Sequence, residues 1–339
     1  MQNLCYARLY PPTCEVLRPA QKFMIKFVVY GKIIIDNIRL LDGRIARNVL
    51  GGGGPQGAFG ARLWDASVGF LSRSGTDMPT EPGDMLHSLG LDLSGWMQYP
   101  DLPTLRGGLA YDERQQLVPA HIAGLDSVTR VELLEHWHTL LSRPIPLPSA
   151  YRSPRAIHLI TEYHDEPMVH DALALHAKGA VFSLEPIIDY KGWTNREEIL
   201  SLLPQVDLVT PDWPSASGIA GSDDPKQVMQ HWAKLGARAV AVRHSQHGSY
   251  VWDGDHDEYW HVPAVPAPVI DPTGAGNSYG GGWCVGWTHT QNARVAGCYG
   301  TTSASFLVRQ VGMPPMSAAL QQEAHALFEQ TLPKIKRLL

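Results

Sequence analysis

The sequence predicts an α/β protein with a mostly parallel central sheet and helices on both of its faces. Three observations support this prediction. The run Phe23 to Ile35 is β-rich and almost continuously apolar, interrupted by Lys26, Gly31 and Lys32. Strand-like and helix-like segments then alternate, which is the rhythm of a doubly wound sheet. A small-residue loop at 274–276 precedes an apolar run, so we expect this loop to open a helix.

The first elements follow this rhythm. The run Phe23 to Ile35 is typical of a strand buried in a parallel sheet. A glycine-rich break at Gly51 to Gly54 then precedes a predicted helix over Ala58 to Trp64 and a short strand over Val68 to Leu71. The order strand, loop, helix, strand is the repeating unit of such a sheet.

The second half repeats the alternation. A helix is predicted over Asp171 to Lys178, and another begins near Pro225, capped by Ser222 or Asp223. The Asp-Gly turn at 253–254 favours a hairpin. The predicted strands are Ala156 to Thr161, Val181 to Leu184, Val206 to Thr210, Ala237 to Val242, Ser249 to Trp252 and Glu258 to Val262. Because the rhythm crosses the proline-rich segment 143–154, we expect one domain over 23–339.

Composition excludes several functional classes. The 339 residues carry a formal net charge of −5, which provides no broad basic surface for nucleic acid. No two of the four cysteines are separated by two residues, so a metal-binding pair is not indicated. A reduced, cytoplasmic setting is the simplest interpretation.

The N-terminal segment and the hydropathy pattern give no membrane signal. No run approaches the roughly 20 apolar residues of a membrane span. Residues 1–22 contain Pro11, Pro12 and Pro19 and lack a continuous apolar core, so they make a poor signal peptide. We interpret them as a poorly ordered extension, with an organellar-targeting segment as the alternative.

The stretch Val269 to Ser278 is the most informative part of the chain. Gly274, Ala275 and Gly276 are small enough for a ligand to approach their backbone N–H groups. A helix N-terminus also has unpaired N–H groups and a partial positive charge. This loop is therefore predicted to bind an anion such as a phosphate, and a purely structural glycine turn is the alternative.

The residues Asp271 to Asn277 resemble the Asp-Thr-x-Gly-Ala-Gly-Asp signature of the PfkB (ribokinase-like) family of sugar and nucleoside kinases. The resemblance implies a ribokinase-like three-layer fold with a small β lid, formed by about 32–50 and 103–118. It further implies ATP, Mg²⁺, a sugar or nucleoside acceptor and, through the lid, a homodimer. The family's last Asp is its catalytic base, and this chain has Asn277 there.

Three interpretations of Asn277 remain open, because an amide has no useful basicity near neutral pH. Asn277 could orient the acceptor hydroxyl while another group takes the proton. The protein could bind ligands without turnover, or the scaffold could run a different reaction. Asp271 is the nearest ionisable substitute, although a role in fixing the loop through backbone N–H groups competes with that one.

The resemblance also assigns an acceptor side. The run Gly31 to Asp36 resembles the family's first strand, whose final acidic residue touches the substrate. The pair Gly52 and Gly53 resembles its substrate-side glycines, and Gln56 is the nearest match to an Asn that usually follows. Pro103-Thr104 resembles a lid strand, so Thr104 and Arg106 are further candidates for acceptor binding.

The nucleotide and metal side departs further from the family pattern. The family carries Asn-x-x-Glu after a central strand, whereas this chain has Asp212 and Ser215 there. Asp212 can serve as an oxygen ligand for Mg²⁺, and Glu185 is a candidate for the missing carboxylate, with a surface role as its alternative. Arg243, Gly248 and Thr273 are expected near the ATP phosphates. For Arg243, a solvated charge at a strand end is the competing interpretation.

The function predicted from the sequence is ATP-dependent phosphorylation of a hydroxyl on a sugar or nucleoside, at a divergent catalytic centre. Two alternatives remain: a non-catalytic ligand-binding or regulatory protein on the same scaffold, and a nucleotide-binding enzyme of another reaction type.

Overall fold

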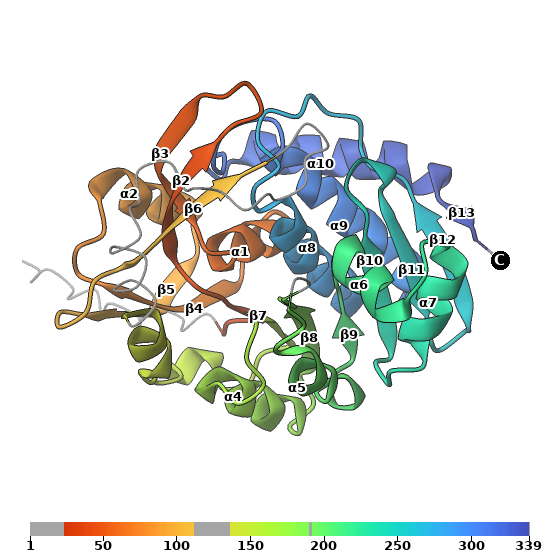
Figure 1. Cartoon of the computed structure of the whole chain (residues 1–339), viewed down its shortest axis with the longest axis horizontal. Helices are drawn as coiled ribbons and strands as arrows, with labels where there is room; N and C mark the ends of the chain where they lie inside the picture. The colour runs from red at the N-terminus through yellow and green to blue at the C-terminus, as the bar shows by residue number, and fades with distance from the viewer. Residues whose placement is uncertain (1–23, 112–135, 190–191, 339) are drawn as a thin grey trace, which may run out of the picture.

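The computed structural model describes residues 24–111, 136–189 and 192–338 (Figure 1). The predicted N-terminal extension, 1–22, lies outside the described residues, and so does the 112–118 part of the expected lid. No helix among the described residues is long and apolar enough to cross a membrane.

A ten-stranded sheet forms the centre of the molecule, in the order β13-β12-β11-β10-β9-β8-β7-β1-β4-β5. The six pairings from β10 through β9, β8, β7, β1 and β4 to β5 are all parallel. The strands at the other end pair antiparallel. Their bounds are β1 Phe27–Tyr30, β4 Val68–Gly75, β5 Asp92–Tyr99, β7 Ala156–Thr161, β8 Val181–Pro186, β9 Leu208–Val209, β10 Ala239–Arg243, β11 Ser249–Asp253, β12 Glu258–Val262 and β13 Lys336–Arg337. The predicted mostly parallel sheet is thus confirmed.

Helices cover both faces of this sheet (Figure 1). Val28 and Tyr30 of β1 belong to a core shared with α4, α5, α6 and α7, whereas Phe27 and Val29 belong to a core shared with α1, α2, α8, α9 and α10. Alternation along a strand directs side chains to opposite faces, so one strand feeds both cores. The helices are α1 Gly54–Arg62, α2 Thr80–Ser88, α4 Pro167–His176, α5 Arg196–Leu200, α6 Trp213–Ala220, α7 Pro225–Ala233, α8 Ala275–Thr290, α9 Ala293–Leu307 and α10 Ala318–Thr331.

The prediction of one strand over Phe23 to Ile35 is wrong. The chain leaves the large sheet after Tyr30 and resumes as β2, Ile34–Arg39, in a second sheet. The break falls at Gly31 and Lys32, the residues that interrupt the apolar run. A β-carbon on Gly31 would lie 2.5 Å from the Gly54 Cα, so the close approach of α1 requires glycine where the chain changes sheets.

The second sheet has three strands, in the order β3-β2-β6, with β3 at Ile45–Gly51 and β6 at Leu105–Ala110. β2 pairs antiparallel with β3 and parallel with β6. These strands match the predicted segments 32–50 and 103–118 in their described part. The small second sheet is therefore present, and its action as a lid stays a prediction.

Helix α8 is fixed against α1 by close backbone contact. A β-carbon on Gly60 would lie 2.0 Å from the Ser278 carbonyl oxygen, and one on Gly281 would lie 1.9 Å from the Gly57 carbonyl oxygen. Only glycine allows two helices to approach so closely. As a result the first turn of α8, which carries the predicted anion loop, is held beside the start of α1.

Helix capping differs in one detail from the sequence prediction. The N-cap of α7 is Asp224, whose side chain accepts a hydrogen bond from the backbone N–H of Lys226 at 3.1 Å, rather than Ser222 or Asp223. The predicted hairpin of β11 and β12 is confirmed.

Candidate active site

One large cleft, of about 1040 Å³, gathers nearly all of the predicted site residues. Its walls come from the second sheet, the start of α1, the first turn of α8, and the segments that follow β8, β9 and β10. The predicted residues that line it are Asp36, Gly52, Gly53, Gln56, Arg106, Glu185, Asp212, Arg243, Gly248, Thr273, Gly274, Ala275, Gly276 and Asn277.

The predicted anion loop does open a helix. Gly274 is the N-cap of α8 with φ 76°, a left-handed conformation that glycine adopts without strain, and no side chain caps the helix. Ala275 N–H donates to the Pro272 carbonyl, and Ser278 N–H to the Gly274 carbonyl. Among the described residues, the backbone N–H groups of Gly276 and Asn277 have no such carbonyl partner. These two groups and the helix dipole can hold an anion in the cleft.

Asn277 lies in a charged cluster at the base of the cleft. Its side-chain Nδ2 donates to Glu185 Oε1 at 2.8 Å, and Arg243 Nη1 donates to the same oxygen at 2.5 Å. Glu185 is only 2% exposed. Burial alone would raise its pKa, but the Arg243 guanidinium and His158 outweigh burial and lower the pKa of Glu185. The Arg243 guanidinium and the Asn277 amide, which both donate to Oε1, thus favour the ionised form of this buried carboxyl group.

Asp36 is positioned by the second sheet. It lies on β2 between Gly51 of β3 and Gly107 of β6, where added β-carbons would lie 1.8 Å and 2.4 Å from its carboxyl oxygens. Burial, reinforced by the charge of Asp271 and opposed by that of Lys32, raises the pKa of Asp36 to about 7. The carboxyl group can therefore bind a hydroxyl in either protonation state near neutral pH.

The acceptor side also contains residues that sequence reasoning missed. Lys32 and Trp137 line the cleft beside Gly52, Gly53 and Gln56. The Lys32 ammonium forms an ion pair with Glu162 and lies 5.5 Å from the Trp137 ring centroid. The sequence shows Lys32 only as an interruption of an apolar run, and a charged residue inside such a run is the signal that could have found it.

Several buried polar atoms beside this part of the cleft have no partner. Gln56 Nε2 donates to the Leu50 carbonyl at 2.9 Å, which leaves Gln56 Oε1 buried and unpaired among the described residues. Trp137 Nε1 and Glu162 Oε2 are buried and unpaired in the same way. Buried polar groups in proteins are normally hydrogen-bonded, so these atoms are candidates for contacts with a ligand.

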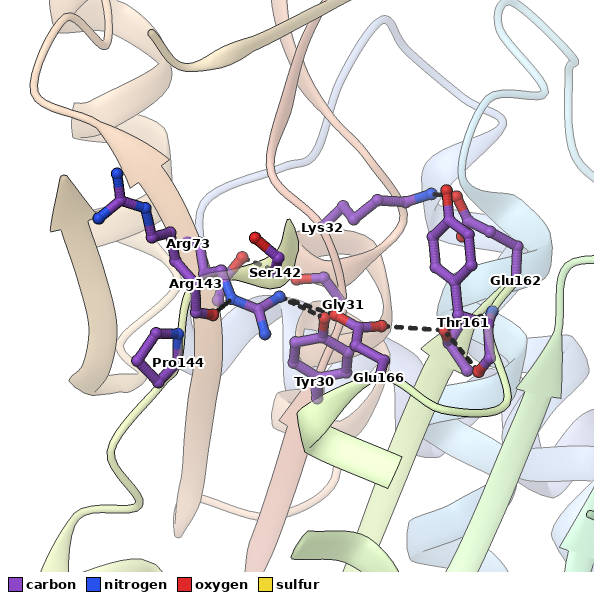
Figure 2. Close-up of polar contacts among 12 residues, drawn as sticks. Tyr30, Gly31, Lys32, Arg73, Ser142, Arg143, Pro144, Thr161, Glu162 and Glu166 are labelled. Atoms are coloured by element: carbon purple, nitrogen blue, oxygen red, sulfur yellow. Dashed lines mark hydrogen bonds and ion pairs between the residues drawn. The ribbon is translucent and has the colours of Figure 1, made fainter. Parts of the chain in front are cut away.

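A buried ion pair braces the sheet next to Lys32 (Figure 2). Arg73 Nη1, from β4, donates to Glu166 Oε1 at 2.7 Å and to the Tyr30 hydroxyl of β1 at 2.8 Å. Thr161 Oγ1, at the end of β7, donates to Glu166 Oε2 at 3.0 Å. The carboxyl ends of three neighbouring strands are thereby tied together beneath the acceptor side.

The structure places two predicted site residues outside the cleft. Thr104 is fully buried, and its backbone N–H donates to Asp77 Oδ1 at 2.6 Å, while its Oγ1 has no partner among the described residues, so its role in acceptor binding stays a prediction. Asp271 is 1% exposed and accepts a hydrogen bond from the Thr273 backbone N–H at 3.0 Å. Asp271 therefore holds the backbone of the loop through Oδ1, which is the competing role considered for it.

The Thr273 side chain links the anion loop to the second sheet. Its Oγ1 donates to the hydroxyl of Tyr111, which directly follows β6, at 3.1 Å. Tyr111 lines the cleft and was not predicted as a site residue. This hydrogen bond joins the expected lid to the expected phosphate loop.

The nucleotide side combines a strand end with an aromatic wall. Arg243 ends β10, and a β-carbon on Gly276 would lie 2.5 Å from its Nη1, so its guanidinium lies directly against the anion loop. Gly248 lines the cleft near by. Trp213, which was not predicted, also lines the cleft and stacks on His244 with ring centroids 4.0 Å apart.

Mg²⁺ fits this donor set only if most of its ligands come from the nucleotide and water. Among the described residues, no three His, Cys, Asp or Glu side chains are arranged to hold a metal. Asp212 caps α6 by accepting the Ser215 N–H through Oδ1 at 2.9 Å, which leaves Oδ2 for the cleft. Phosphates, waters and one carboxylate are a normal Mg²⁺ environment in kinases.

These features define a class of protein: an α/β phosphotransferase scaffold with an anion-binding helix N-terminus facing an acceptor site beneath a small sheet. A family comparison gives the particular family. Residues 24–318 match the model of the pfkB family carbohydrate kinases, and the chain belongs to this family. PfkB kinases use ATP with Mg²⁺, which bears out the cofactors expected from the sequence.

Two curated relatives match the chain over most of their length. The chain is 27% identical over 266 residues to the cytidine kinase of Thermococcus kodakarensis, covering 78% of this chain and 89% of that protein. It is 22% identical over 331 residues to Protein MAK32 of Saccharomyces cerevisiae, covering 85% of each.

Solved structures share the fold. The adenosine kinase of Sinorhizobium meliloti aligns with a TM-score of 0.66 at 19% identity, covering 90% of this chain and 99% of that chain. The nucleoside kinase of Methanocaldococcus jannaschii, described as an archaeal member of the ribokinase family, aligns with a TM-score of 0.64 at 18% identity, covering 91% and 99%. The predicted ribokinase-like fold is confirmed.

Proposed function

We propose that the protein transfers the γ-phosphoryl group of ATP to a hydroxyl group of a nucleoside. One observation carries this proposal: the helix N-terminus at Gly274 to Asn277, which we assign to the phosphates, lines the same cleft as Asp36, Gly52 and Gly53, which we assign to the acceptor. The acceptor oxygen would form the new bond to phosphorus as the bond to the ADP oxygen breaks, and the hydroxyl proton would leave to solvent or product phosphate.

A nucleoside suits the shape and chemistry of the acceptor side. Trp137, Ile34 and Leu109 offer an aromatic and apolar surface to a flat base. Gln56 Oε1, which lies in the wall of the cleft, can accept a hydrogen bond from a ribose hydroxyl or from an exocyclic amine, and it lacks a protein partner in the described residues. Similarity to a cytidine kinase across most of both chains adds support.

Asn277 is compatible with slow or ordinary turnover. Phosphoryl transfer passes through a loose transition state, so positioning and charge stabilisation supply most of the acceleration. A placed general base contributes only about 10²–10⁴-fold. Asn277 would orient the acceptor hydroxyl by accepting its hydrogen bond, and Asp212 would help to hold Mg²⁺.

The test is phosphate transfer from labelled ATP across a panel of nucleosides and sugars. We expect the highest kcat/KM for a nucleoside, with Trp137→Ala raising the acceptor KM more than tenfold. Preference for a free sugar would defeat the nucleoside assignment. No transfer to any acceptor, with ATP and nucleoside binding retained in calorimetry, would favour the non-catalytic alternative, to which the missing catalytic Asp points.

The metal assignment has its own test. Asp212→Asn keeps the helix cap, because Asn and Asp cap equally well, but removes the charge. We expect Mg²⁺-dependent ATP binding to weaken while thermal stability stays near that of the wild type. Asp224→Asn, the same change at the cap of α7, is the matched control. ATP titrations of Asp212→Asn that match wild type at every Mg²⁺ concentration would remove Asp212 from the metal site.

A further inference from the structure

The Asn277 amide contacts a carboxylate that the sequence had assigned to the metal. Glu185 Oε1 accepts both the Asn277 Nδ2 hydrogen bond, at 2.8 Å, and the Arg243 Nη1 hydrogen bond, at 2.5 Å. Its second oxygen, Oε2, lies 3.5 Å from His158 Nε2. An added β-carbon on Gly280 would lie 2.6 Å from Oε2, so this oxygen is turned toward α8. Glu185 Oε1 therefore accepts two hydrogen bonds, whereas Oε2 lies near His158 without a hydrogen-bond partner among the described residues.

The two residues beside the Glu185 carboxylate, His158 and Arg243, are themselves fixed in position. His158 is 1% exposed, and its Nδ1 lies 3.0 Å from Ser183 Oγ, one strand along the sheet. Arg243 has a side chain 13% exposed and also lies 3.4 Å from the Pro211 carbonyl. The groups that face Glu185 thus fix its position before any ligand binds.

A buried ionised carboxylate dictates which end of an amide it meets. A carboxylate accepts hydrogen bonds and cannot donate them, whereas an amide has a donor end and an acceptor end. Asn277 must therefore turn its NH₂ toward Glu185. The other end of the amide, Oδ1, is free to meet a ligand in the cleft, because it accepts no hydrogen bond from the described residues.

We propose that Glu185 is a positioning residue for phosphoryl transfer: its carboxylate fixes the Asn277 amide so that Oδ1 accepts the acceptor hydroxyl, and it anchors Arg243 beside the anion loop. This inference rests on the proposed kinase function and replaces the metal role expected for Glu185. The carboxylate that contacts Asn277 thus comes from β8, whereas the family's catalytic Asp would occupy position 277 on α8 itself.

Asn277→Asp alone, which restores the family's Asp, should therefore not raise kcat. Asn277→Asp would place a second carboxylate within hydrogen-bond distance of Glu185, where like charges disfavour double ionisation. Arg243 would offset only part of that repulsion. Adding Glu185→Gln would relieve it, because the new amide can donate to the new carboxylate.

The experiment is a double-mutant cycle with Asn277→Asp, Glu185→Gln and the combined variant, measured by kcat, by ATP affinity and by thermal unfolding without ligands. Each single variant should lower kcat by about 10- to 100-fold, the order of loss from misplaced reacting groups. ATP affinity should change much less than kcat in Asn277→Asp, whereas Glu185→Gln, which also releases Arg243, should weaken ATP binding as well. The combined variant should regain both kcat and melting temperature relative to Asn277→Asp. Glu323→Gln, which breaks a surface pair with Arg309, is the control and should match wild type.

The decisive result is a reversal of the effect of Glu185→Gln between the native protein and the Asn277→Asp variant. Glu185→Gln should harm the native protein and help the Asn277→Asp variant. Effects that multiply independently, or a rise in kcat for Asn277→Asp alone, would overturn the proposal. If the wild type transfers no phosphate to any acceptor, the kinase function fails. The thermal-unfolding cycle would still test the contact between Glu185 and Asn277. Melting temperatures that change independently in the two variants would overturn the proposal.

Discussion

Gly276 shows how one missing side chain leaves room for the proposed anion site. It lies in the first turn of α8 with an unpaired N–H group, and the Arg243 guanidinium occupies the space that a side chain would need. Glycine at this position lets the Arg243 guanidinium lie directly against the first turn of α8, beside the proposed anion site.

Replacing Gly276 by Val should therefore abolish ATP binding. The branched side chain would block the N–H groups and displace Arg243. Calorimetry should detect no ATP binding, while circular dichroism retains the native spectrum. Gly83→Val is the matched control, since a β-carbon there meets only Met78 Sδ at 3.8 Å. Unchanged ATP affinity in Gly276→Val would remove the anion assignment.

Asp36 shows that the acceptor side is maintained at a cost in stability. Its pKa is about 7 in the folded protein against an ordinary value of 3.8, because it is buried and close to Asp271. Between about pH 4 and pH 7 the folded state binds the extra proton and the unfolded state does not. The free energy of unfolding therefore falls as pH rises through this window, by up to roughly 4 kcal/mol.

Asp36→Asn should remove this dependence. The variant should be more stable than wild type at pH 8 and gain much less at pH 5, measured by urea unfolding, while losing phosphate transfer. Asp42→Asn, at an exposed carboxylate whose pKa is lowered by the backbone and side chain of Arg44, should show no such gain. Equal stabilisation at both pH values would contradict the raised pKa of Asp36.

At the scale of elements, the site depends on strands whose ends are tied together. The pair of Arg73 and Glu166 joins β4 to the segment after β7, and Tyr30 adds β1 (Figure 2). Both charged side chains are almost fully buried. Removing one partner of such a pair costs more than removing both, because a buried charge is left without compensation.

We expect Arg73→Met to lower the free energy of unfolding by about 3–5 kcal/mol. Adding Glu166→Leu should recover most of that loss, as measured by urea unfolding. Arg309→Met, which breaks an exposed pair with Glu323, should cost under about 1 kcal/mol. Additive losses in the double variant would show that the pair does not act as a unit.

At the scale of the whole molecule, the second sheet places apolar side chains at its outer end. Leu41 and Ile45, around the turn between β2 and β3, are 38% and 39% exposed. The sequence resemblance implies a homodimer through the lid. The exposed pair is consistent with that proposal, because apolar side chains in an exposed turn gain from burial against a second copy.

Ile45→Glu should weaken such a dimer at least tenfold, as followed by sedimentation equilibrium, since a charge would be placed in an apolar interface. Met24→Glu, at an exposed Met outside the second sheet, should leave the association unchanged. A wild-type protein that is monomeric at every concentration measured would defeat the dimer proposal.

Much of this protein can be predicted from local sequence patterns. The apolar runs located the strands β4, β7, β8, β9 and β10, since burial on both faces of a parallel sheet requires such runs. The Asp-Gly turn located the antiparallel hairpin of β11 and β12. The Gly-Ala-Gly loop before an apolar run located the start of α8, because helix initiation and phosphate approach both depend on local backbone. The family resemblance supplied the candidate residues of the cleft.

Tertiary structure alone decided how those residues meet. The run Phe23 to Ile35 divides between two sheets at Gly31, because α1 packs against it there. Lys32, Tyr111 and Trp137 reach the cleft from segments far apart along the chain. Glu185 lies 92 positions from Asn277, and only the packing of α8 on the sheet brings its carboxylate to the amide. Sequence fixes what each residue can donate or accept; the long-range packing of α8 and β8 decides which partner it meets.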